Sequence, residues 1–306
     1  MKIAVQLDPI ATLKPATDTS LMLMEEAQKR GHALFTYHPN ELSWDRGEIS
    51  APLTPVTLDM NAAPFYTLGT PATTPLNTMD VVLMRQDPPF DMAYITATHL
   101  LQQLPTTTRV LNNPAGVRNA PEKLSILGFA QFMPPTLISR DAAAIERFAQ
   151  AHETIIAKPL YGYGGRGVFK LSRHDVNRDT LLEFWCESSR EPLMWQAFLP
   201  EVAEGDRRVL FIHGEVACVF GRTPAEDSIR ANMRVGGTPV QATLTPRQQT
   251  ICQALSPFLK REGLVLAGID FIGDYLTEIN VTSPTGLRAA QRLYGINLAA
   301  TFWDGL

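Results

Sequence analysis

The stretch AGIDFIGDYLTEINVTSPTG, residues 267–286, predicts two strands joined by a tight turn at Gly273-Asp274. Side chains alternate across a strand, so Glu278 and Asn280 share one face. Asp270, on the preceding strand, can reach the same face. Two carboxylates and an amide oxygen form a hard, oxygen-only cluster suited to Mg²⁺ bound together with nucleotide phosphates. The alternatives are a polar hairpin edge, or carboxylates neutralised by an arginine.

A glycine-rich segment, KPLYGYGGRGVFK at residues 158–170, is the second chemical signal. A predicted strand (154–160) delivers Lys158, and Gly162, Gly164, Gly165 and Gly167 connect it to another strand (168–172). Glycines let backbone N–H groups approach an anion. No GK[ST] follows, as a P-loop requires, and no helix follows, as a dinucleotide-binding turn requires. A flap that closes over phosphates is one interpretation, and a flexible hairpin is the other.

The rest of the chain predicts an α/β protein of three units, 1–120, 121–200 and 201–306. In the first unit we expect strands at 2–7, 33–37, 79–85 and 109–113 and helices at 20–30 and 92–104. Five prolines in 50–78 predict irregular surface structure with a short hairpin rather than a core element. The second unit adds helices at 122–129, 141–151 and 179–188 and a strand at 193–199. The third begins with a hairpin, 206–222, which turns at His213-Gly214.

Composition and charge narrow the functional classes. The 306 residues are 45% hydrophobic and 19% charged, with a formal net charge of -4. A nucleic-acid partner is not expected without a basic surplus. The cysteines, Cys186, Cys218 and Cys252, form no CxxC pair and are expected to be reduced packing residues. The short N-terminal apolar run predicts a strand rather than a signal segment, and no membrane span is expected. We therefore expect a soluble cytoplasmic protein.

Four basic residues lie at predicted strand or helix ends, where ligands of α/β proteins bind. Lys123 and Lys158 belong to the second unit, Arg85 ends a strand of the first, and Arg208 begins a strand of the third. Each taken alone is interpreted as a surface charge. Together with the two motifs above they are candidate clamps for anionic groups. No histidine stands beside a nucleophilic Ser or Cys, so a hydrolase triad is not indicated.

Several segments resemble bacterial glutathione synthetases of the ATP-grasp superfamily. They are KPLxGxGGxGVF, MxQxFLPEVxxGDRRVL and GIDFIGDxLTEINVTSPTG, with AVQLDPIATL, VVLMRQDPPFD and NNPAGVRNAPEKL nearer the N-terminus. The resemblance spans nearly the whole chain in the family's order. It implies a three-unit α+β ATP-grasp fold, in which ATP lies between the central and C-terminal units.

The resemblance also implies roles for individual residues. ATP would be bound by Lys123, Lys158, Gly162, Gly164, Gly165, Gly167, Gln196, Ala197, Phe198, Leu199 and Asp206. Asp270, Glu278 and Asn280 would hold Mg²⁺, with Mn²⁺ as an alternative. Arg208 and Lys158 would act in catalysis together with Asn232, from a loop that covers the site. Arg85 would hold the acceptor carboxylate, and Asp8, Ser283 and Thr285 would complete the substrate site.

The implied reaction joins γ-glutamylcysteine to glycine through an acyl phosphate, in a homo-oligomer that is a tetramer or a dimer. The chain departs from the family pattern at Tyr161, Gln86, Ala231, Arg234 and Ala289. These departures leave a ligase for another acyl donor or amine as an alternative. A regulatory nucleotide-binding protein without catalysis is a third hypothesis, and the intact Asp270, Glu278 and Asn280 argue against it.

Overall fold

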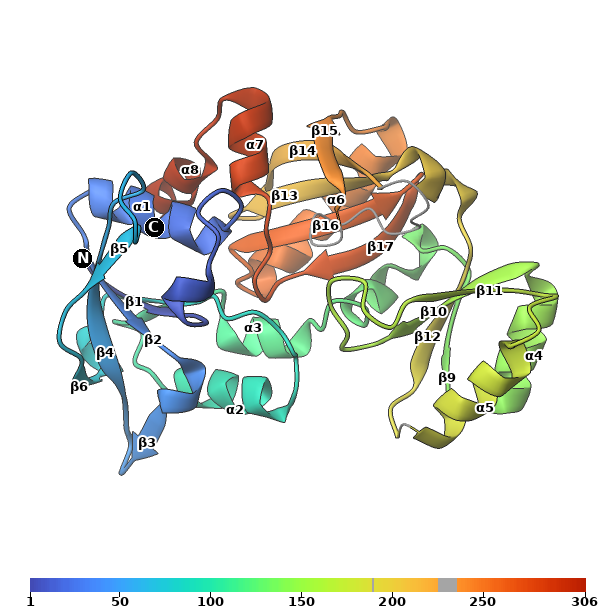
Figure 1. Ribbon diagram of the computed structural model, residues 1–306, viewed down its shortest axis with the longest axis horizontal. Helices are drawn as coiled ribbons and strands as arrows, with labels where there is room; N and C mark the ends of the chain where they lie inside the picture. Colours follow the sequence, from blue (N-terminus) through green and yellow to red (C-terminus); the bar gives the residue numbers. More distant parts are fainter. Residues whose placement is uncertain (189, 225–235) are drawn as a thin grey trace.

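A computed structural model describes residues 1–188, 190–224 and 236–306 of the chain. Its strands form three sheets (Figure 1). The first sheet lies on the side of the N-terminus, the second lies at the opposite end of the molecule, and the third lies between them. The first sheet takes its strands from residues 2–111, the second from 136–197 and the third from 206–280. The unit boundaries near 120 and 200 stay a prediction, although each sheet is built from one of the expected ranges.

The N-terminal sheet has the order β3-β4-β2-β1-β7-β8, and β5 and β6 pair with β4. Strands β1, β2, β7 and β8 run parallel, as the alternation of strands and helices predicts. Helix α1 begins where the Asp18 side chain accepts a hydrogen bond from the Leu21 N–H. The elements are β1 Lys2–Gln6, α1 Thr19–Lys29, β2 Ala33–Tyr37, β3 Ser43–Asp45, β4 Glu48–Leu58, β5 Tyr66–Leu68, β6 Ala72–Pro75, β7 Val81–Met84, α2 Met92–Leu101, β8 Arg109–Leu111 and α3 Pro114–Asn119.

The expectation of irregular surface structure is wrong for residues 50–58, which belong to strand β4, whereas the expected short hairpin is present, since β5 pairs antiparallel with β4. On β4 the side chains of Ile49, Ala51, Leu53, Val56 and Leu58 are buried. Buried apolar residues alternate at 49, 51 and 53 and again, shifted by one position, at 56 and 58, a pattern that the prolines obscured. Proline lacks an N–H but keeps its acceptor, and the carbonyl of Pro55 accepts a hydrogen bond from the Gly69 N–H.

The central sheet is antiparallel, with the order β11-β10-β12-β9. Two helices cover one of its faces (Figure 1). They pack on a core around the buried Trp195. The expected α-helix at 122–129 is instead a 3₁₀ helix, Ser125–Phe132, interrupted by non-helical backbone at Phe129. The elements are β9 Thr136–Ser139, α4 Ala142–Ala151, β10 Thr154–Pro159, β11 Phe169–Ser172, α5 Arg178–Ser188 and β12 Leu193–Ala197.

The C-terminal sheet has the order β15-β14-β13-β16-β17, and all its pairings are antiparallel. The expected turns at His213-Gly214 and Gly273-Asp274 are confirmed, since each separates two paired strands. Helix α6 begins with a capping box formed by Thr245 and Gln248. The elements are β13 Asp206–Ile212, β14 Glu215–Thr223, β15 Thr238–Gln241, α6 Pro246–Arg261, β16 Leu266–Ile272, β17 Tyr275–Asn280, α7 Leu287–Tyr294 and α8 Leu298–Asp304.

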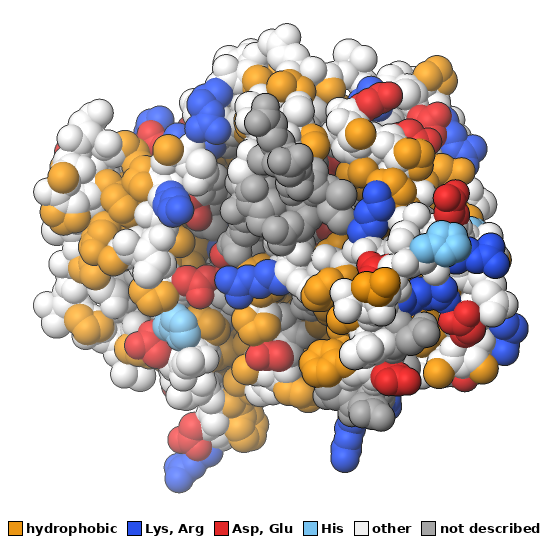
Figure 2. Space-filling model, turned by 45° about the vertical axis from the view of Figure 1, so that its right-hand side comes forward, with side chains coloured by type: hydrophobic (Ala, Val, Ile, Leu, Met, Phe, Trp, Pro, Cys, Tyr) orange, Lys and Arg blue, Asp and Glu red, His pale blue; other side chains and the backbone are white. Residues whose placement is uncertain are grey.

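The last two helices return to the N-terminal unit. Helices α7 and α8 lie beside α1 (Figure 1), and their apolar side chains share one buried cluster with those of α1 and β1. Within the described residues, no helix is long and apolar enough to cross a membrane. On the face drawn in Figure 2, positive and negative side chains of the described residues are interspersed with apolar ones.

Candidate active site

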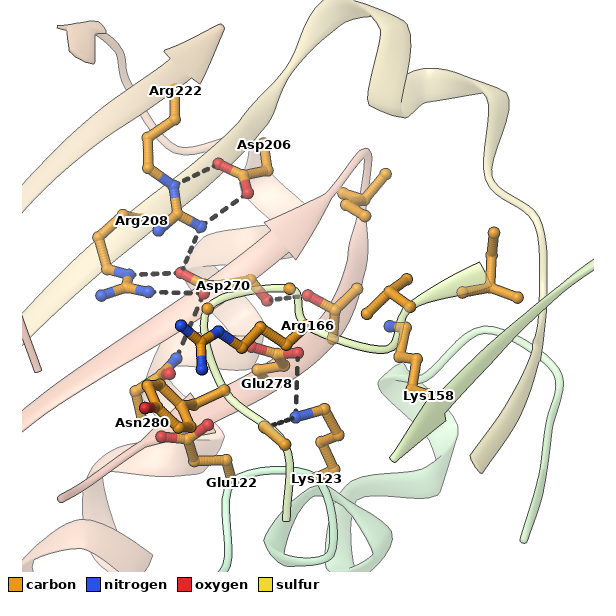
Figure 3. A pocket seen from close by; sticks show the side chains of 18 of the residues that line it. Glu122, Lys123, Lys158, Arg166, Asp206, Arg208, Arg222, Asp270, Glu278 and Asn280 are labelled. Carbon is orange, nitrogen blue, oxygen red and sulfur yellow. Dashed lines mark hydrogen bonds and ion pairs between the residues drawn. The ribbon is translucent and has the colours of Figure 1, made fainter. Parts of the chain in front are cut away.

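A pocket lies between the central and C-terminal sheets, beneath the loop that joins β10 to β11. We call this loop, residues 160–168, the flap. The pocket is lined by glycines of the flap, by the end of β12 and by side chains from β13, β16 and β17. Segments that are far apart in sequence therefore converge at one cavity, as the two motifs predicted. Figure 3 shows the charged side chains of this pocket.

Two lysines reach the pocket from the central unit. Lys158 is 9% exposed, and its Nζ donates a 2.7 Å hydrogen bond to Oε1 of Gln196. Burial lowers the pKa of Lys158 below its usual value. Lys123 is 3% exposed, and its Nζ donates to the Gly162 carbonyl at 2.6 Å and lies 3.7 Å from Oε1 of Glu278. A buried ammonium group with these few acceptors is suited to an anionic ligand such as a phosphate.

Two arginines and two aspartates form a continuous chain of ion pairs on the C-terminal sheet (Figure 3). Arg208 donates to both oxygens of Asp270, from Nε at 2.5 Å and from Nη2 at 2.7 Å. Arg222 donates to both oxygens of Asp206, at 2.6 and 2.7 Å. Its Nη2 also lies 3.1 Å from Oδ1 of Asp270. Burial opposes the charged form of Asp270, but the two arginines outweigh it and hold its pKa at about 2.

The three expected metal ligands are brought together, and their oxygen chemistry suits a hard cation such as Mg²⁺. Asp270 pairs with Glu278 across the strands, and Asn280 follows two residues later on β17. The Asp270 carboxylate is nevertheless engaged on all sides, because Asn280 Nδ2 donates to it at 3.2 Å in addition to the two arginines. A carboxylate has about four lone-pair positions, so a cation reaches Asp270 only when one donor moves away.

Among the described residues, no group of three or more His, Cys, Asp or Glu side chains is placed to hold a metal ion. The Nδ2 atom of Asn280 is used by Asp270 and by the Gly268 carbonyl, so its Oδ1 is the atom available to a cation. Glu278 is the more accessible carboxylate, with 27% of its side chain exposed. The hypothesis of an arginine-neutralised carboxylate thus describes Asp270 in this structure, while Glu278 and Asn280 fit the metal hypothesis.

The end of β12 forms the wall of the pocket opposite the metal candidates. Gln196, Ala197, Phe198 and Leu199 all line the pocket, where the resemblance implies the adenine edge. Gln196 is held between Lys158 and the Thr136 hydroxyl, to which its Nε2 donates at 3.0 Å. The Lys170 ammonium group lies over the Phe198 ring, 3.8 Å from the ring centroid. This cation–π contact fixes strand β11 against the β12 wall.

The expected substrate residues divide into two groups. Ser283 and Thr285 line the pocket, and the Thr285 carbonyl accepts a 3.3 Å hydrogen bond from Arg208 Nη1. Arg85 is buried behind that wall, where it donates to the Ser20 hydroxyl at 3.0 Å and to the Pro284 carbonyl at 3.1 Å. Asp8 accepts from the Asp87 N–H at 2.8 Å. Arg85 and Asp8 therefore support the wall of the pocket here rather than lining it.

The departures from the family pattern lie in different places. Gln86 is buried and accepts a 2.7 Å hydrogen bond from Gln6 Nε2, and Tyr161 stacks on Phe90 at the start of the flap. Ala289, on α7, is 2% exposed in an apolar cluster and does not line the pocket. Asn232, Ala231 and Arg234 lie outside the described residues.

Among the charged side chains that line the pocket, the sequence analysis assigned no role to four: Asp87, Glu122, Arg166 and Arg222. Burial, opposed by Lys123, raises the pKa of Glu122 to about 7. No local sequence pattern marks this carboxyl group, because the Thr282 hydroxyl that donates to it belongs to the distant C-terminal unit. Arg222 lies opposite Asp206 because a β-bulge shifts the register of the hairpin between Leu210 and Phe211. The predicted turn alone would place Gly221 there, so it does not mark Arg222.

Comparisons with known proteins agree with this geometry. The family model described as "Prokaryotic glutathione synthetase, N-terminal domain" matches residues 1–118, and that for the "ATP-grasp domain" of the same family matches residues 122–295. A glutathione synthetase of Rhodopseudomonas palustris is 47% identical over 304 residues, which cover 99% of this chain and 97% of the relative. A glutathione synthetase of Brucella melitensis is 48% identical over 306 residues, 100% of this chain and 98% of the relative.

Solved structures share the fold at low sequence identity. The crystal structure of D-cycloserine synthetase DcsG matches with a TM-score of 0.70 at 14% identity, covering 100% of this chain and 99% of the other. Macrocyclase MdnC bound with precursor peptide MdnA, from Microcystis aeruginosa, matches with a TM-score of 0.67 at 17% identity and the same coverage. With its whole length matched by family models and by relatives of near 50% identity, the chain belongs to the prokaryotic glutathione synthetase family of ATP-grasp ligases.

Proposed function

We propose that this protein joins γ-glutamylcysteine to glycine at the expense of ATP, giving glutathione, ADP and phosphate. The observation that carries the proposal is the convergence of Lys123, Lys158 and the flap glycines on the cluster around Glu278. The near full-length similarity to glutathione synthetases of two bacteria supports the same substrates.

The nucleotide phosphates are proposed to lie beneath the flap, against the two buried lysines. Both lysines have few acceptors of their own, so a phosphate gains a charge-assisted hydrogen bond without breaking a strong ion pair. The adenine would lie against residues 196–199, and Asp206 would accept from the ribose hydroxyls. Arg222 holds the Asp206 carboxylate in a fixed orientation for that contact.

ATP-grasp enzymes use ATP and Mg²⁺. In this chain we propose that Glu278 and Asn280 hold the metal, and that Asp270 joins them when one of its donors withdraws. A divalent cation in this position neutralises the charge of the phosphates and orients them. Mn²⁺, also an oxygen-preferring ion, is proposed as a substitute.

The acyl donor's carboxylate is a poor electrophile, so its oxygen first attacks the γ-phosphorus and ADP leaves. The glycine amine then attacks the carbonyl carbon of the acyl phosphate, and phosphate departs with the former carboxylate oxygen. Arg208 is proposed to stabilise the transferring phosphoryl group, since positioning and charge neutralisation are what phosphoryl transfer requires. No protein nucleophile is needed.

The test is ADP release with Mg-ATP and γ-glutamylcysteine, measured with and without glycine, with the product identified by mass. We expect turnover that depends on glycine and yields glutathione. Turnover only with another acyl donor or amine would replace these substrates and keep the reaction class. Absence of turnover with every dipeptide tested, despite tight ATP binding, would contradict the proposal and favour a regulatory protein.

A ligase for another substrate pair is the second candidate. It is favoured by the acceptor side, where Arg85 is already bound to Ser20 and Pro284 and where Gln86 pairs with Gln6. We propose glycine as the acceptor nevertheless, because Ser283 and Thr285 remain on the pocket wall. A cytoplasmic location and assembly into a dimer or tetramer are carried over as proposals from the family resemblance.

A further inference from the structure

The flap of the central unit rests on the N-terminal unit through an aromatic contact. The ring of Tyr161, at the start of the flap, stacks on Phe90 with centroids 6.2 Å apart and planes inclined by 18°. Phe90 in turn contacts the ring of Tyr94 at 5.2 Å. Phe90 and Tyr94 are 8% and 4% exposed, so the flap contacts a firmly packed part of the N-terminal unit.

A hydrogen bond within the central unit also holds the start of the flap. The Gly162 carbonyl, next to Tyr161, accepts the 2.6 Å hydrogen bond from Lys123. A small second cavity separates the two surfaces, lined by Pro88, Phe90, Pro121, Glu122, Leu160, Tyr161, Gly162 and Tyr163. The flap is therefore placed by contacts at its base, whereas its glycine-rich tip covers the main pocket.

The N-terminal segment beneath Tyr161 also reaches the reaction site. Pro88 and Asp87, two and three residues before Phe90, line the main pocket. Arg85, two residues before Asp87, donates to the carbonyl of Pro284, which belongs to the opposite wall. The ring contact between Tyr161 and Phe90 thus joins the base of the flap to segment 85–90.

We propose that Tyr161 is a positioning residue that latches the flap onto Phe90 and so couples nucleotide binding to the binding of the acyl donor. The proposal rests on the proposed function for the identity of the two ligands. A nucleotide holds the flap down through its phosphates, and the latch then orders segment 85–90 beside the acyl donor. Binding of either ligand therefore lowers the free-energy cost of ordering the flap and segment 85–90 when the other ligand binds. Such coupling between two binding sites is reciprocal.

The latch has a chemical consequence for the intermediate. If water reaches the acyl phosphate, its oxygen attacks the carbonyl carbon and the bond to the phosphate oxygen breaks. The free carboxylate and phosphate are then regenerated, and one ATP is converted to ADP without a peptide bond. A flap that is held at its base excludes that water while the amine attacks.

Variants at residue 161 separate the ring contact from the hydroxyl group. A carboxylate cannot stack on Phe90, so Y161D removes the ring contact. Y161F keeps the ring and removes only the hydroxyl. F90L removes the partner ring, and F169L is the matched control, since Phe169 follows the flap but contacts Trp185 within the central unit.

The first experiment is calorimetric titration of γ-glutamylcysteine into the protein with and without a non-hydrolysable ATP analogue and Mg²⁺. For the wild type, Y161F and F169L we expect the analogue to tighten dipeptide binding about 2- to 10-fold, the range that one aromatic contact supports. For Y161D and F90L we expect that factor to approach one. The double variant Y161D/F90L should lose no more of this tightening by the ATP analogue than either single variant loses.

The second experiment compares ADP released with glutathione formed. The wild type, Y161F and F169L should give nearly equal amounts, whereas Y161D and F90L should release an excess of ADP. Unchanged coupling and an unchanged ratio in Y161D would overturn the latch, and so would an equal loss in F169L. If the wild type itself makes no glutathione, the proposed function fails instead. The coupling measurement with the ATP analogue then still tests the latch for any acyl donor that binds.

Discussion

At the scale of single residues, the Asp270 carboxylate shows how a buried charge can be kept ionised. Its oxygens accept from two arginines and from Asn280, and its pKa is held at about 2. It is therefore negative at every pH at which the protein is expected to work. Buried ion pairs of this kind are costly to break, because removing one partner leaves a charge without compensation.

Glu278 is the residue at which the proposed metal site can be tested most directly. Substituting Glu278→Gln removes one negative charge from the accessible carboxylate. We expect a loss of roughly 2–4 kcal/mol in transition-state stabilisation, by analogy with the loss of a preorganised charge contact. The measurement is kcat/KM for ATP, with the exposed Glu153→Gln as a control. A kcat near that of the wild type would remove Glu278 from the metal site.

Glu122 predicts a pH dependence of stability. Burial raises its pKa from the usual 4.5 to about 7 in the folded protein. Between these pH values the carboxyl group loses its proton only in the unfolded chain. Raising the pH through this range therefore lowers the free energy of the unfolded chain relative to that of the folded protein. The contribution of Glu122 is therefore fully present below pH 4.5 and is lost as the pH rises towards 7, by about 3 kcal/mol.

We expect Glu122→Gln to abolish this part of the pH dependence. The free energy of unfolding, measured in urea from pH 4.5 to 8, should fall with pH more steeply in the wild type than in the variant. Comparing the two chains cancels the other titrating groups. Parallel profiles would show that Glu122 titrates near its ordinary pKa in the folded protein.

At the scale of elements, the flap depends on backbone conformations that only glycine adopts readily. Gly167 has φ +69°, and a Cβ there would lie 2.9 Å from Cγ of Pro159. Substituting Gly167→Ala should strain the flap by about 1–2 kcal/mol, the cost of a left-handed conformation with a side chain. Because the flap is partly exposed, we expect the strain to be relieved by opening it.

The expected result for Gly167→Ala is a KM for ATP that rises roughly tenfold, with the melting temperature nearly unchanged. Gly128→Ala is the matched control, because a Cβ at Gly128 meets nothing within 4 Å and its φ is not positive. An unaltered KM in the Gly167 variant would mean that the flap conformation seen here is not the one that binds nucleotide.

At the scale of the whole molecule, Asn112 joins the N-terminal and C-terminal units. Its Nδ2 donates to the carbonyls of Leu266 and Val281, both at 2.8 Å, and its Oδ1 accepts from the Leu266 N–H at 2.9 Å. The side chain is 6% exposed, so water cannot replace these bonds easily. One amide therefore satisfies three backbone groups of the opposite unit.

Removing that amide should loosen the whole molecule. We expect Asn112→Ala to lower the free energy of unfolding by about 3 kcal/mol or more, since buried backbone groups lose their partners. Urea unfolding followed by fluorescence measures this, with Asn61→Ala in an exposed turn as the control. A loss below about 0.5 kcal/mol, typical of a surface substitution, would show that the two units do not depend on this contact.

Local sequence patterns were sufficient where one segment decides its own structure. The alternation around Glu278 and the turn glycine at 273 predicted the β16–β17 hairpin, and the glycines after Lys158 predicted the flap between two strands. The chemistry of those two segments, with the family motifs, also predicted several residues that line the pocket, among them Lys123, Lys158 and Glu278, but not its full lining. Backbone preferences and side-chain alternation act over a few residues, so they can be read from the sequence alone.

Tertiary structure decided the remaining features. It made a buried strand of β4 despite its prolines, placed Ala289 in the core and engaged the Asp270 carboxylate with two arginines. It also partly buried Glu122 and stacked Tyr161 on Phe90. In each case the free energy depends on which distant groups displace water around the residue, and the local sequence does not specify those neighbours.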